Sequence, residues 1–522
     1  MLMSSEESLR RSTFSTLVVM GSTMVSRLLG FARIAIIGAV FGGAGQADVL
    51  NLVFNIPNNL RKLLAEGALS SAFIPVLSST IVEDNSGSTS RSIVRQILTL
   101  QWMILLPVMA ASVVFAGPII RTILDFPEVE RQVLAAGLFR WMIHYLFLIS
   151  ISAVLMGTLN SHNRFLIPAV TPILFSVAVI GAVLLLHRTM GVYSMALGVL
   201  IGGVLQVLFQ TPSFVGLGYD FRPSFRFSDP RFRIVMAQWL PVVGTASIYT
   251  INQQVAMFFA SGLEDGSGSA MTNALTFWQL PFGIFGASIT TVLFPRMSRQ
   301  SAAGDRQGLG ESLQYGFRYL IALLIPSAVV MGLLSHEIVA VALQRGEFLP
   351  QYTSLAARAL TGYSLGLLSV GAFSFFQRFF YAIGDFRTPM ITAVVAFVLD
   401  VLLSLWLKET RLRVVGLAVA NSIAFTVALG LMVFAAHKAL GGLDFRRIGV
   451  TFGKVVLSVL PAAVAIVLLL RATGSWWVEG STAANLGRLL GISLVAVVLV
   501  LAMFLVMKVE AFWTLVARRR TR

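Results

Sequence analysis

The chain consists of blocks of about 20 consecutive apolar residues that recur along its 522 residues, the length a helix needs to cross roughly 30 Å of hydrocarbon. Only 12% of the residues are charged and 57% are hydrophobic, with a mean hydropathy of +0.84. A soluble domain keeps roughly a quarter of its residues charged. Segments of strand-like alternation are absent, and no stretch between the blocks could form a soluble catalytic domain. The sequence therefore predicts an all-α integral membrane protein that moves something across a bilayer and does no covalent chemistry.

The apolar blocks predict about 14 transmembrane helices, several of them longer than one bilayer crossing and therefore tilted or extended beyond the lipid. Short polar turns such as GGAGQ and SHNR separate them. The expected helices are 14–41, 48–80, 93–118, 132–159, 165–187, 192–216, 233–262, 269–295, 316–343, 354–383, 388–408, 414–437, 449–471 and 485–508.

Lys and Arg set the predicted orientation. With the N-terminus inside, most of them fall in the cytoplasmic segments, as the positive-inside rule requires. Both termini are then cytoplasmic, which agrees with an even number of spans. The polar start, MLMSSEESLRRSTFS, has no cleavable small-residue site and is expected to form a short cytoplasmic tail before the first span.

The chain also repeats itself at an interval of about 220 residues. The segment AFIPVLSS resembles VLFPRMSR, and NRFLIPAV resembles the later DFRTPMITAV. Arg140 and Tyr145 are matched in the same register by Arg358 and Tyr363. Six helices separate the copies, so both have the same orientation in the membrane, which indicates a parallel repeat.

This repeat predicts an N-lobe of six helices, a C-lobe of six helices and two further C-terminal helices with a basic tail. The expected boundaries are 1–218, 219–440 and 441–522. Two facing six-helix lobes are the architecture of an alternating-access transporter.

Ionisable residues inside the spans are concentrated in the first two helices. Each costs from about 2.5 kcal/mol upward, so each needs a reason to be there. Ser26 and Arg33 share one helical face, and Arg27 flanks it. In the second helix, Pro57, Asn58 and Asn59 precede Arg61, so its first half is expected to bend or unwind.

Arg27, Arg33 and Arg61 have no close anion in the sequence, whereas Lys62 and Glu66 are four residues apart and can pair. Three guanidiniums facing lipid would be very costly. The favourable arrangement places them around a wet cavity that receives an anion, because the guanidinium binds phosphate oxygens in a bidentate manner. The alternative is that some of them reach the membrane interface or pair with distant carboxylates. The predicted substrate-binding residues are Arg27, Arg33, Arg61, Glu66, Ser26 and Asn58.

Three further residues have a structural or a coupling role. Asp48 lies at the start of the second helix, where a carboxylate favours the helix dipole, and Lys62 is the partner of Glu66. Asp400 is the other buried acid; it could hold a cation, carry a proton or pair with an arginine such as Arg378. The sequence leaves open whether transport is driven by a monovalent cation or by the membrane potential.

Other ligand classes find no support in the sequence. The formal charge of +16 is explained by topology-setting loop arginines, and no basic helix with exposed aromatic residues predicts binding to nucleic acid. The five histidines have no ligand spacing, so neither a metal site nor another cofactor is expected. Cysteine is absent, which excludes disulfides.

The first two helices carry a resemblance to a known family. SRLLGFAR, the FGGAGQAD turn and IPNNLRKLLAEGALSSAFIPVLS resemble the MurJ (MviN) lipid II flippases of the multidrug/oligosaccharidyl-lipid/polysaccharide exporter superfamily. LNSHNRFLIPAVTPIL, GGVLQVLFQTP, the RGEF turn and FYAIGDFRTP continue the resemblance in order, through the twelfth helix. No catalytic residues are expected on this interpretation.

The resemblance implies export of a polyprenyl-pyrophosphate-linked glycan, lipid II, across the bacterial inner membrane by a protein expected to act as a monomer. It implies two six-helix lobes around a central cavity, with helices 13 and 14 forming a lipid-accessible groove for the polyprenyl tail. The family's cavity arginines match Arg27, Arg33 and Arg61, and its helix 2 acid matches Glu66.

The chain departs from the family pattern at three positions. Ile34 stands where an Asp is common, Thr276 aligns with a further cavity arginine, and Ala256 aligns near a sodium-binding acid. Nearby Asn252, Gln253, Gln254, Asn273 and Gln279 could substitute by hydrogen bonding, which is weaker than charge-assisted contact.

Two rival transporters remain open. A flippase for another polyprenyl-linked glycan, such as O-antigen, predicts the same arginine cavity. A cation-coupled drug antiporter would require acids in the N-lobe. An enzyme acting on polyprenyl phosphate would need clustered carboxylates or histidines near an interface, and a structural scaffold would not explain three unpaired arginines.

Overall fold

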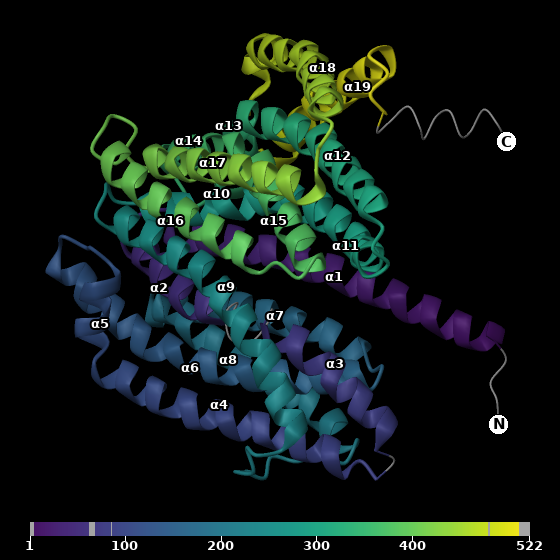
Figure 1. The fold of residues 1–522 in the computed structure, drawn as a ribbon. Coiled ribbons are helices and arrows are strands. Elements are labelled where there is room, and N and C mark those ends of the chain that lie inside the picture. Colours follow the sequence, from purple (N-terminus) through teal and green to yellow (C-terminus); the bar gives the residue numbers. More distant parts are fainter. Residues whose placement is uncertain (1–4, 62–67, 85, 479–480, 511–522) are drawn as a thin grey trace. The chain divides into compact units, whose positions relative to one another are not determined.

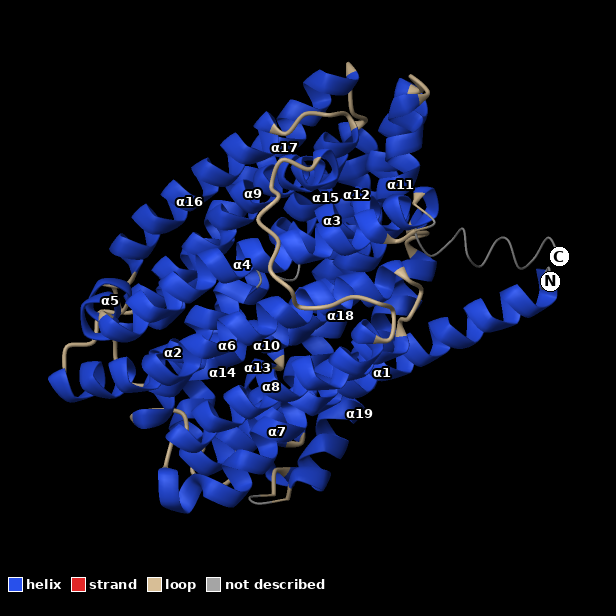
Figure 2. Cartoon of the chain, turned by 90° about the horizontal axis from the view of Figure 1, so that it is seen from below, coloured by secondary structure: helices blue, strands red, loops and turns tan. Residues whose placement is uncertain are grey.

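The computed structural model describes residues 5–61, 68–84, 86–478 and 481–510. Within these ranges every regular element is a helix and no strand occurs (Figure 2), which confirms the predicted all-α class. The chain divides into two compact units, Met1–Gly262 and Leu263–Arg522.

The first unit contains nine helices in its described residues, labelled in Figure 1. Their bounds are α1 Ser5–Phe41, α2 Gln46–Arg61, α3 Ala68–Glu83, α4 Ser88–Val114, α5 Ala116–Ile123, α6 Val129–Ser161, α7 Leu166–Met190, α8 Tyr193–Val215 and α9 Pro230–Ser261.

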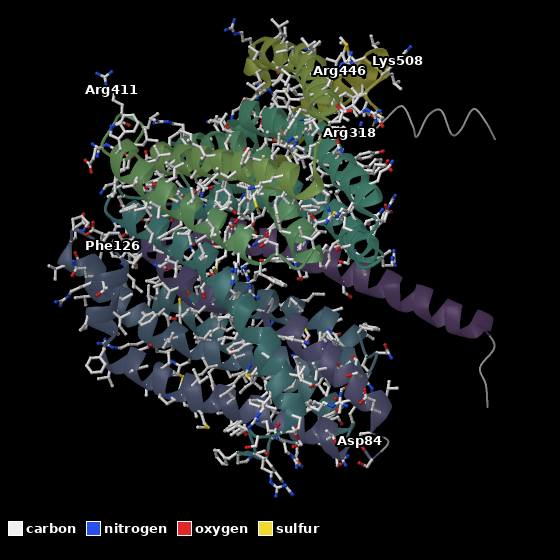
Figure 3. All side chains as sticks on the ribbon, in the orientation of Figure 1. Asp84, Phe126, Arg318, Arg411, Arg446 and Lys508 are labelled. Atoms are coloured by element: carbon white, nitrogen blue, oxygen red, sulfur yellow. The ribbon has the colours of Figure 1, made fainter. Side chains whose placement is uncertain are left out.

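Helix α6 is the centre of this unit, because it packs against α2, α3, α4, α5 and α8. Its 33 residues span about 50 Å, well beyond the roughly 30 Å of a hydrocarbon core. Helix α7 packs against α8 and α1, and Gly198 and Gly202 of α8 allow the close approach, since a Cβ at either would lie within 3 Å of α7 atoms. Phe126 and Asp84 lie at opposite ends of the unit (Figure 3).

The segment between α8 and α9 is fixed on α4 by polar contacts. Asp220 accepts a bond of 2.6 Å from Nε of Arg95, and the backbone N–H of Ser224 donates to Thr99. The hydrogen bond from Arg95 holds the pKa of the Asp220 carboxyl below its ordinary range. Helix α9 then packs against α3, α2 and α4, so it belongs to the first compact unit. In the predicted sequence repeat, by contrast, the same helix is the first of the second copy.

The second unit is built from the remaining helices. Their bounds are α10 Ser267–Pro281, the π-helical segment η2 Phe282–Gly286, α11 Ala287–Ala302, α12 Arg306–Leu333, α13 Ser335–Leu343, α14 Pro350–Leu365, α15 Leu367–Ala382, α16 Arg387–Leu407, α17 Val414–Leu440, α18 Phe445–Ala472, the 3-10 turn η3 Gly474–Trp476 and α19 Thr482–Val506.

The two units repeat the same order of elements at the interval of roughly 220 residues seen in the sequence. A long helix and a short one, α4 and α5, correspond to α12 and α13; α6 corresponds to α14 with α15, and the hairpin of α7 and α8 to that of α16 and α17. The packing partners correspond as well: α2 lies on α6, and α10 lies on α14. Helices α18 and α19 pack on each other and have no counterpart in the first unit.

One expected helix, 354–383, is broken. Helices α14 and α15 meet at Gly366 with a bend of 47°. A Cβ at Gly366 would lie 2.8 Å from the Cα of Ser422 in α17, so the close packing of α17 requires glycine at this break. The expected helix 316–343 is also interrupted, at Leu334 between α12 and α13.

Eleven helices among the described residues are long and apolar enough to cross a membrane, or twelve if α14 and α15 form one bent span. The predicted count of about 14 is therefore not confirmed. The expected span 48–80 includes residues 62–67, which lie outside the described ranges, and α9 with its Asn252, Gln253 and Gln254 does not qualify. Helix α2 remains helical through Pro57 to Arg61, so the predicted unwinding of its first half is wrong.

Asp48 has a structural partner in the first unit. It lies in the first turn of α2 and is buried, and Nη2 of Arg131 in α6 donates to its Oδ2 over 2.6 Å. The Arg131 guanidinium also lies 4.8 Å from the ring centroid of Phe126. Asp48 thus joins the start of α2 to the start of α6 through an ion pair, a contact that its predicted interaction with the helix dipole did not include.

Replacing Arg131 tests this ion pair. Arg131→Ala removes a partner of a buried carboxylate, so we expect a loss of about 3 kcal/mol in stability and a lower thermal unfolding midpoint of the purified protein. The control is Arg121→Ala on α5, an exposed arginine whose loss should change stability by less than about 0.5 kcal/mol. Equal midpoints for both variants would contradict the structural role.

Candidate functional site

Arg33 lies on α1 with its side chain directed toward the packed helices of the first unit. Its guanidinium carbon is 5.1 Å from the ring centroid of Phe175 in α7. The Phe175 ring lies 5.1 Å from that of Tyr145 in α6. A guanidinium over an aromatic face gains a cation–π interaction. Because this contact uses the flat face of the guanidinium, the N–H groups at its edge can still donate to an acceptor.

Arg61 ends α2, where Nε donates a bond of 3.2 Å to the Asn58 side chain one turn earlier. The charges of Arg33 and Arg61 act on each other and on the buried side chain of Tyr145. We call Arg33, Arg61 and Tyr145 the cationic cluster. It draws on α1, α2 and α6 of one unit, so the structure brings together two of the three predicted arginines.

Of the remaining predicted residues, two lie on α1, two lie outside the described residues and one, Asn58, contacts the cationic cluster. Arg27 is exposed on α1, and Ser26 beside it is half-buried. Glu66 and Lys62, predicted as a pair, lie outside the described residues, so their pairing stays a prediction. Asn58 orients Arg61, as its hydrogen bond shows.

Asp400 is buried in α16 of the second unit. Nδ2 of Asn421 in α17 donates to it over 2.8 Å, and the Ser404 hydroxyl donates over 3.3 Å. Arg378, the suggested partner, instead lies over the rings of Phe294 and Tyr381. The two donors match a carboxylate held in a fixed orientation between α16 and α17.

Two of the five polar residues proposed to replace missing cations donate hydrogen bonds to protein groups, and Thr276 does so as well. Nε2 of Gln254 donates to the Ile123 carbonyl, and Nε2 of Gln253 donates to the Tyr249 hydroxyl. Thr276 bonds back to the Thr272 carbonyl within α10. These contacts fix the chain locally and leave the charge-assisted contacts to the arginines.

Tyr145 and Phe175 were missed as site residues. The sequence singled out Tyr145 only as part of the repeated arginine–tyrosine pair, and Phe175 is one of 38 phenylalanines. The sequence did offer one signal for Tyr145. A tyrosine inside a span is expected to be buried, and a buried hydroxyl normally has a polar partner.

An all-helical chain with a repeated pair of membrane-embedded units and guanidiniums gathered within one of them defines a helical membrane transporter and not an enzyme. A family model described as "Lipid II flippase MurJ" matches residues 37–488. The chain belongs to this family, the lipid II flippase MurJ family.

Individual relatives agree with the family match. The chain is 34% identical over 448 residues to the "Probable lipid II flippase MurJ" of Borreliella burgdorferi, covering 86% of this chain and 88% of that one. It is 29% identical to the "Probable lipid II flippase MurJ" of Vibrio cholerae, with 82% and 83% covered.

Two solved structures share the fold. One is "Lipid II flippase MurJ, inward closed conformation", with a TM-score of 0.76 at 24% identity, covering 94% of this chain and 99% of that chain. The other is an inward-facing multidrug resistance MATE family transporter of the MOP superfamily, with a TM-score of 0.67 at 15% identity, covering 81% and 98%. The chain therefore has the exporter-superfamily fold predicted from its first two helices.

Proposed function

We propose that this chain is a lipid II flippase that moves the precursor from the inner to the outer leaflet by alternating access, acting as a monomer in the bacterial inner membrane. The family supports the substrate, and the cationic cluster carries the chemistry. A guanidinium inside a membrane-embedded unit is costly, and binding an anionic substrate is a reason for keeping one there. A diphosphate is an anion that two guanidiniums can bind through several oxygens at once.

The cluster assigns a task to each of its residues. Arg33 keeps its donors available over the Phe175 face, and Arg61 is oriented by Asn58. We infer that both bind the pyrophosphate while Tyr145 donates its hydroxyl to a further phosphate oxygen. Exposed Arg27 on the same helix makes a first contact with the arriving headgroup, and the polyprenyl tail stays in lipid. No bond is made or broken.

Arg33→Ala tests this assignment. Loss of a charge-assisted contact of about 1.5 to 3 kcal/mol should lower pyrophosphate binding by roughly 10- to 100-fold, and we expect the variant not to rescue cells depleted of their own lipid II flippase. The measurement is growth together with protein level in the membrane.

The matched control is Arg188→Ala, which removes an exposed arginine at the end of α7 and should rescue growth normally. Full rescue by Arg33→Ala at equal expression would overturn the role of Arg33. If the unaltered chain fails to rescue the flippase-depleted strain but exports an O-antigen-type glycan, the substrate is that other polyprenyl-linked glycan.

We further propose that both termini are cytoplasmic, as the distribution of Lys and Arg indicates. The chain contains no cysteine, so single introduced thiols report topology without background. An impermeant maleimide added outside should label Glu409→Cys, in the turn between α16 and α17, and leave Ser86→Cys unlabelled until the membrane is opened. The reverse pattern would contradict the proposed orientation.

Asp400 is our candidate for the coupling group. Its burial and its two donors suit a carboxylate whose charge changes when a cation or a proton binds. Asp400→Asn preserves the shape and removes the charge. We expect the variant to fold with a normal unfolding midpoint and to lose the dependence of transport on ion gradient or membrane potential. Retention of that dependence would show that Asp400 serves only to hold α16 to α17.

A further inference from the structure

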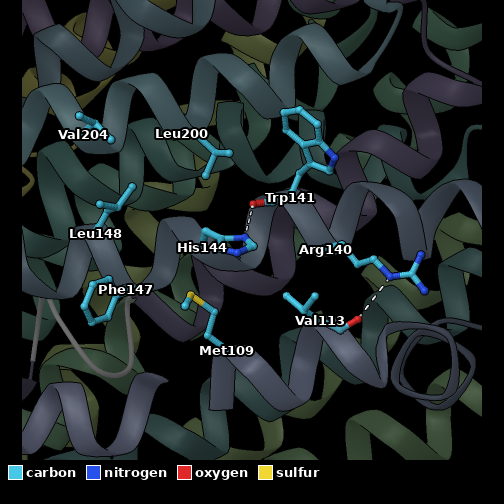
Figure 4. A pocket seen from close by; sticks show the side chains of 9 residues that line it. All are labelled: Met109, Val113, Arg140, Trp141, His144, Phe147, Leu148, Leu200 and Val204. Atoms are coloured by element: carbon cyan, nitrogen blue, oxygen red, sulfur yellow. Dashed lines mark hydrogen bonds between the residues drawn. The ribbon is translucent and has the colours of Figure 1, made fainter. Parts of the chain in front are cut away.

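A groove on the first unit lies between three helices, and none of the residues of the cationic cluster lines it. It has a volume of about 550 Å³ and is lined almost entirely by apolar atoms of α4, α6 and α8 (Figure 4). The apolar residues of its wall are Met109, Val113, Phe147, Leu148, Leu200 and Val204. Nothing in the family assignment or the transport proposal uses this groove.

Arg140 lies at one end of the groove, where Figure 4 shows it beside Val113. Its side chain is exposed, and its Nε donates a long hydrogen bond of 3.3 Å to the Val113 carbonyl. That carbonyl is free to accept because α4 ends at Val114, where the last carbonyls of a helix have no partner of their own. A guanidinium has five N–H donors, so most of those on Arg140 face outward.

The depth of Arg140 in the membrane follows from its neighbours. Tyr193 is the first residue of α8, and its hydroxyl packs against Gly137 of α6, since a Cβ there would lie 2.2 Å from it. The Tyr193 ring also meets Trp141, with 6.2 Å between centroids. Tyr and Trp gather at the membrane interface, and the turn before α8 marks the edge of the apolar layer. Arg140, adjacent to Trp141, therefore lies near headgroup depth.

The groove continues from this point toward the membrane interior. Arg140 and Leu148 are both on α6, about two turns or 12 Å apart along its axis. The groove thus presents a cation at headgroup level and, below it, a channel that is apolar apart from His144. This arrangement complements one lipid: a phosphate at the guanidinium and an acyl chain along Phe147, Leu148 and Val204.

We propose that the groove formed by α4, α6 and α8 is a binding site for an anionic phospholipid of the surrounding bilayer, with its phosphate on Arg140. On the orientation proposed above, this lipid belongs to the outer leaflet. The lipid is not the transported substrate. It fills the space between the three helices, and its phosphate neutralises the charge of Arg140.

The repeat supplies a matched control for this proposal. Arg358 occupies the equivalent position in α14, at the same offset from its tyrosine as Arg140, and it is exposed as well. It is not among the residues that line the groove. Any effect of general positive charge near a headgroup should therefore be equal for Arg140 and Arg358.

The test is native mass spectrometry of the purified full chain in micelles containing equal amounts of phosphatidylglycerol and phosphatidylethanolamine. The unaltered protein should retain phosphatidylglycerol preferentially. Arg140→Ala should lower the retained phosphatidylglycerol about fivefold, the effect of one basic residue near an anionic surface, while Arg358→Ala leaves it unchanged. Val204 is an exposed residue of α8 at the wall of the groove. Val204→Trp fills the groove and should therefore displace the lipid while Arg140 is still present.

Three results would overturn the proposal: equal retention of the two lipids by the unaltered chain, equal losses in Arg140→Ala and Arg358→Ala, or full retention in Val204→Trp. Elution as a single species and an unchanged unfolding midpoint in lipid-free detergent establish that each variant is folded. Rescue of flippase-depleted cells is scored separately, so failure of the lipid site and failure of the transport function are distinguishable.

Discussion

A permanently charged guanidinium packed against an aromatic ring inside a helical unit is the constraint on which the candidate site depends. Arginine cannot lose its proton, so the positive charge stays wherever the fold puts it. Arg33 of α1 lies over the ring of Phe175 in α7, and that ring packs against Tyr145 of α6. On the proposed function, a diphosphate headgroup binds to this charge and to that of Arg61.

The rest of the first unit holds the cluster in place. The pair formed by Asp48 and Arg131 ties α2 to α6 at one end, and glycines of α8 let α7 pack closely behind Phe175. Asn58 fixes Arg61 from within α2. Several independent contacts therefore hold the helices that carry the cluster. They keep the two arginines in place before a ligand arrives.

The fold class, the repeat and the family could be predicted because each depends on a pattern spread over many residues. Apolar blocks give the helices, and the 220-residue interval reappears in the order of α4 to α8 and α12 to α17. Local breaks could not be predicted from such patterns. The need for glycine at the break near residue 366 depends on the approach of Ser422 from another helix, and α2 continues as a helix through Pro57, where a rule based on proline alone predicts a break.

The site was predictable only in part for a related reason. A charge in a span is visible in the sequence, so Arg33 and Arg61 could be named as candidate binding residues. Which charged side chains lie near each other is set by tertiary packing. Arg27 looked equivalent to Arg33 and is instead exposed, while Tyr145 carried no charge to draw attention. Asp48 showed its helix-start position in the sequence, but its partner, Arg131, is 83 residues away.

Binding of three synthetic polyprenyl lipids to the purified chain, differing only in headgroup, tests the central claim most directly. We predict that the diphosphate binds more tightly than the monophosphate, that the neutral alcohol binds weakest, and that the difference shrinks as salt is raised. Equal affinity for all three lipids would show that the gathered guanidiniums do not recognise phosphate, and the account would be wrong.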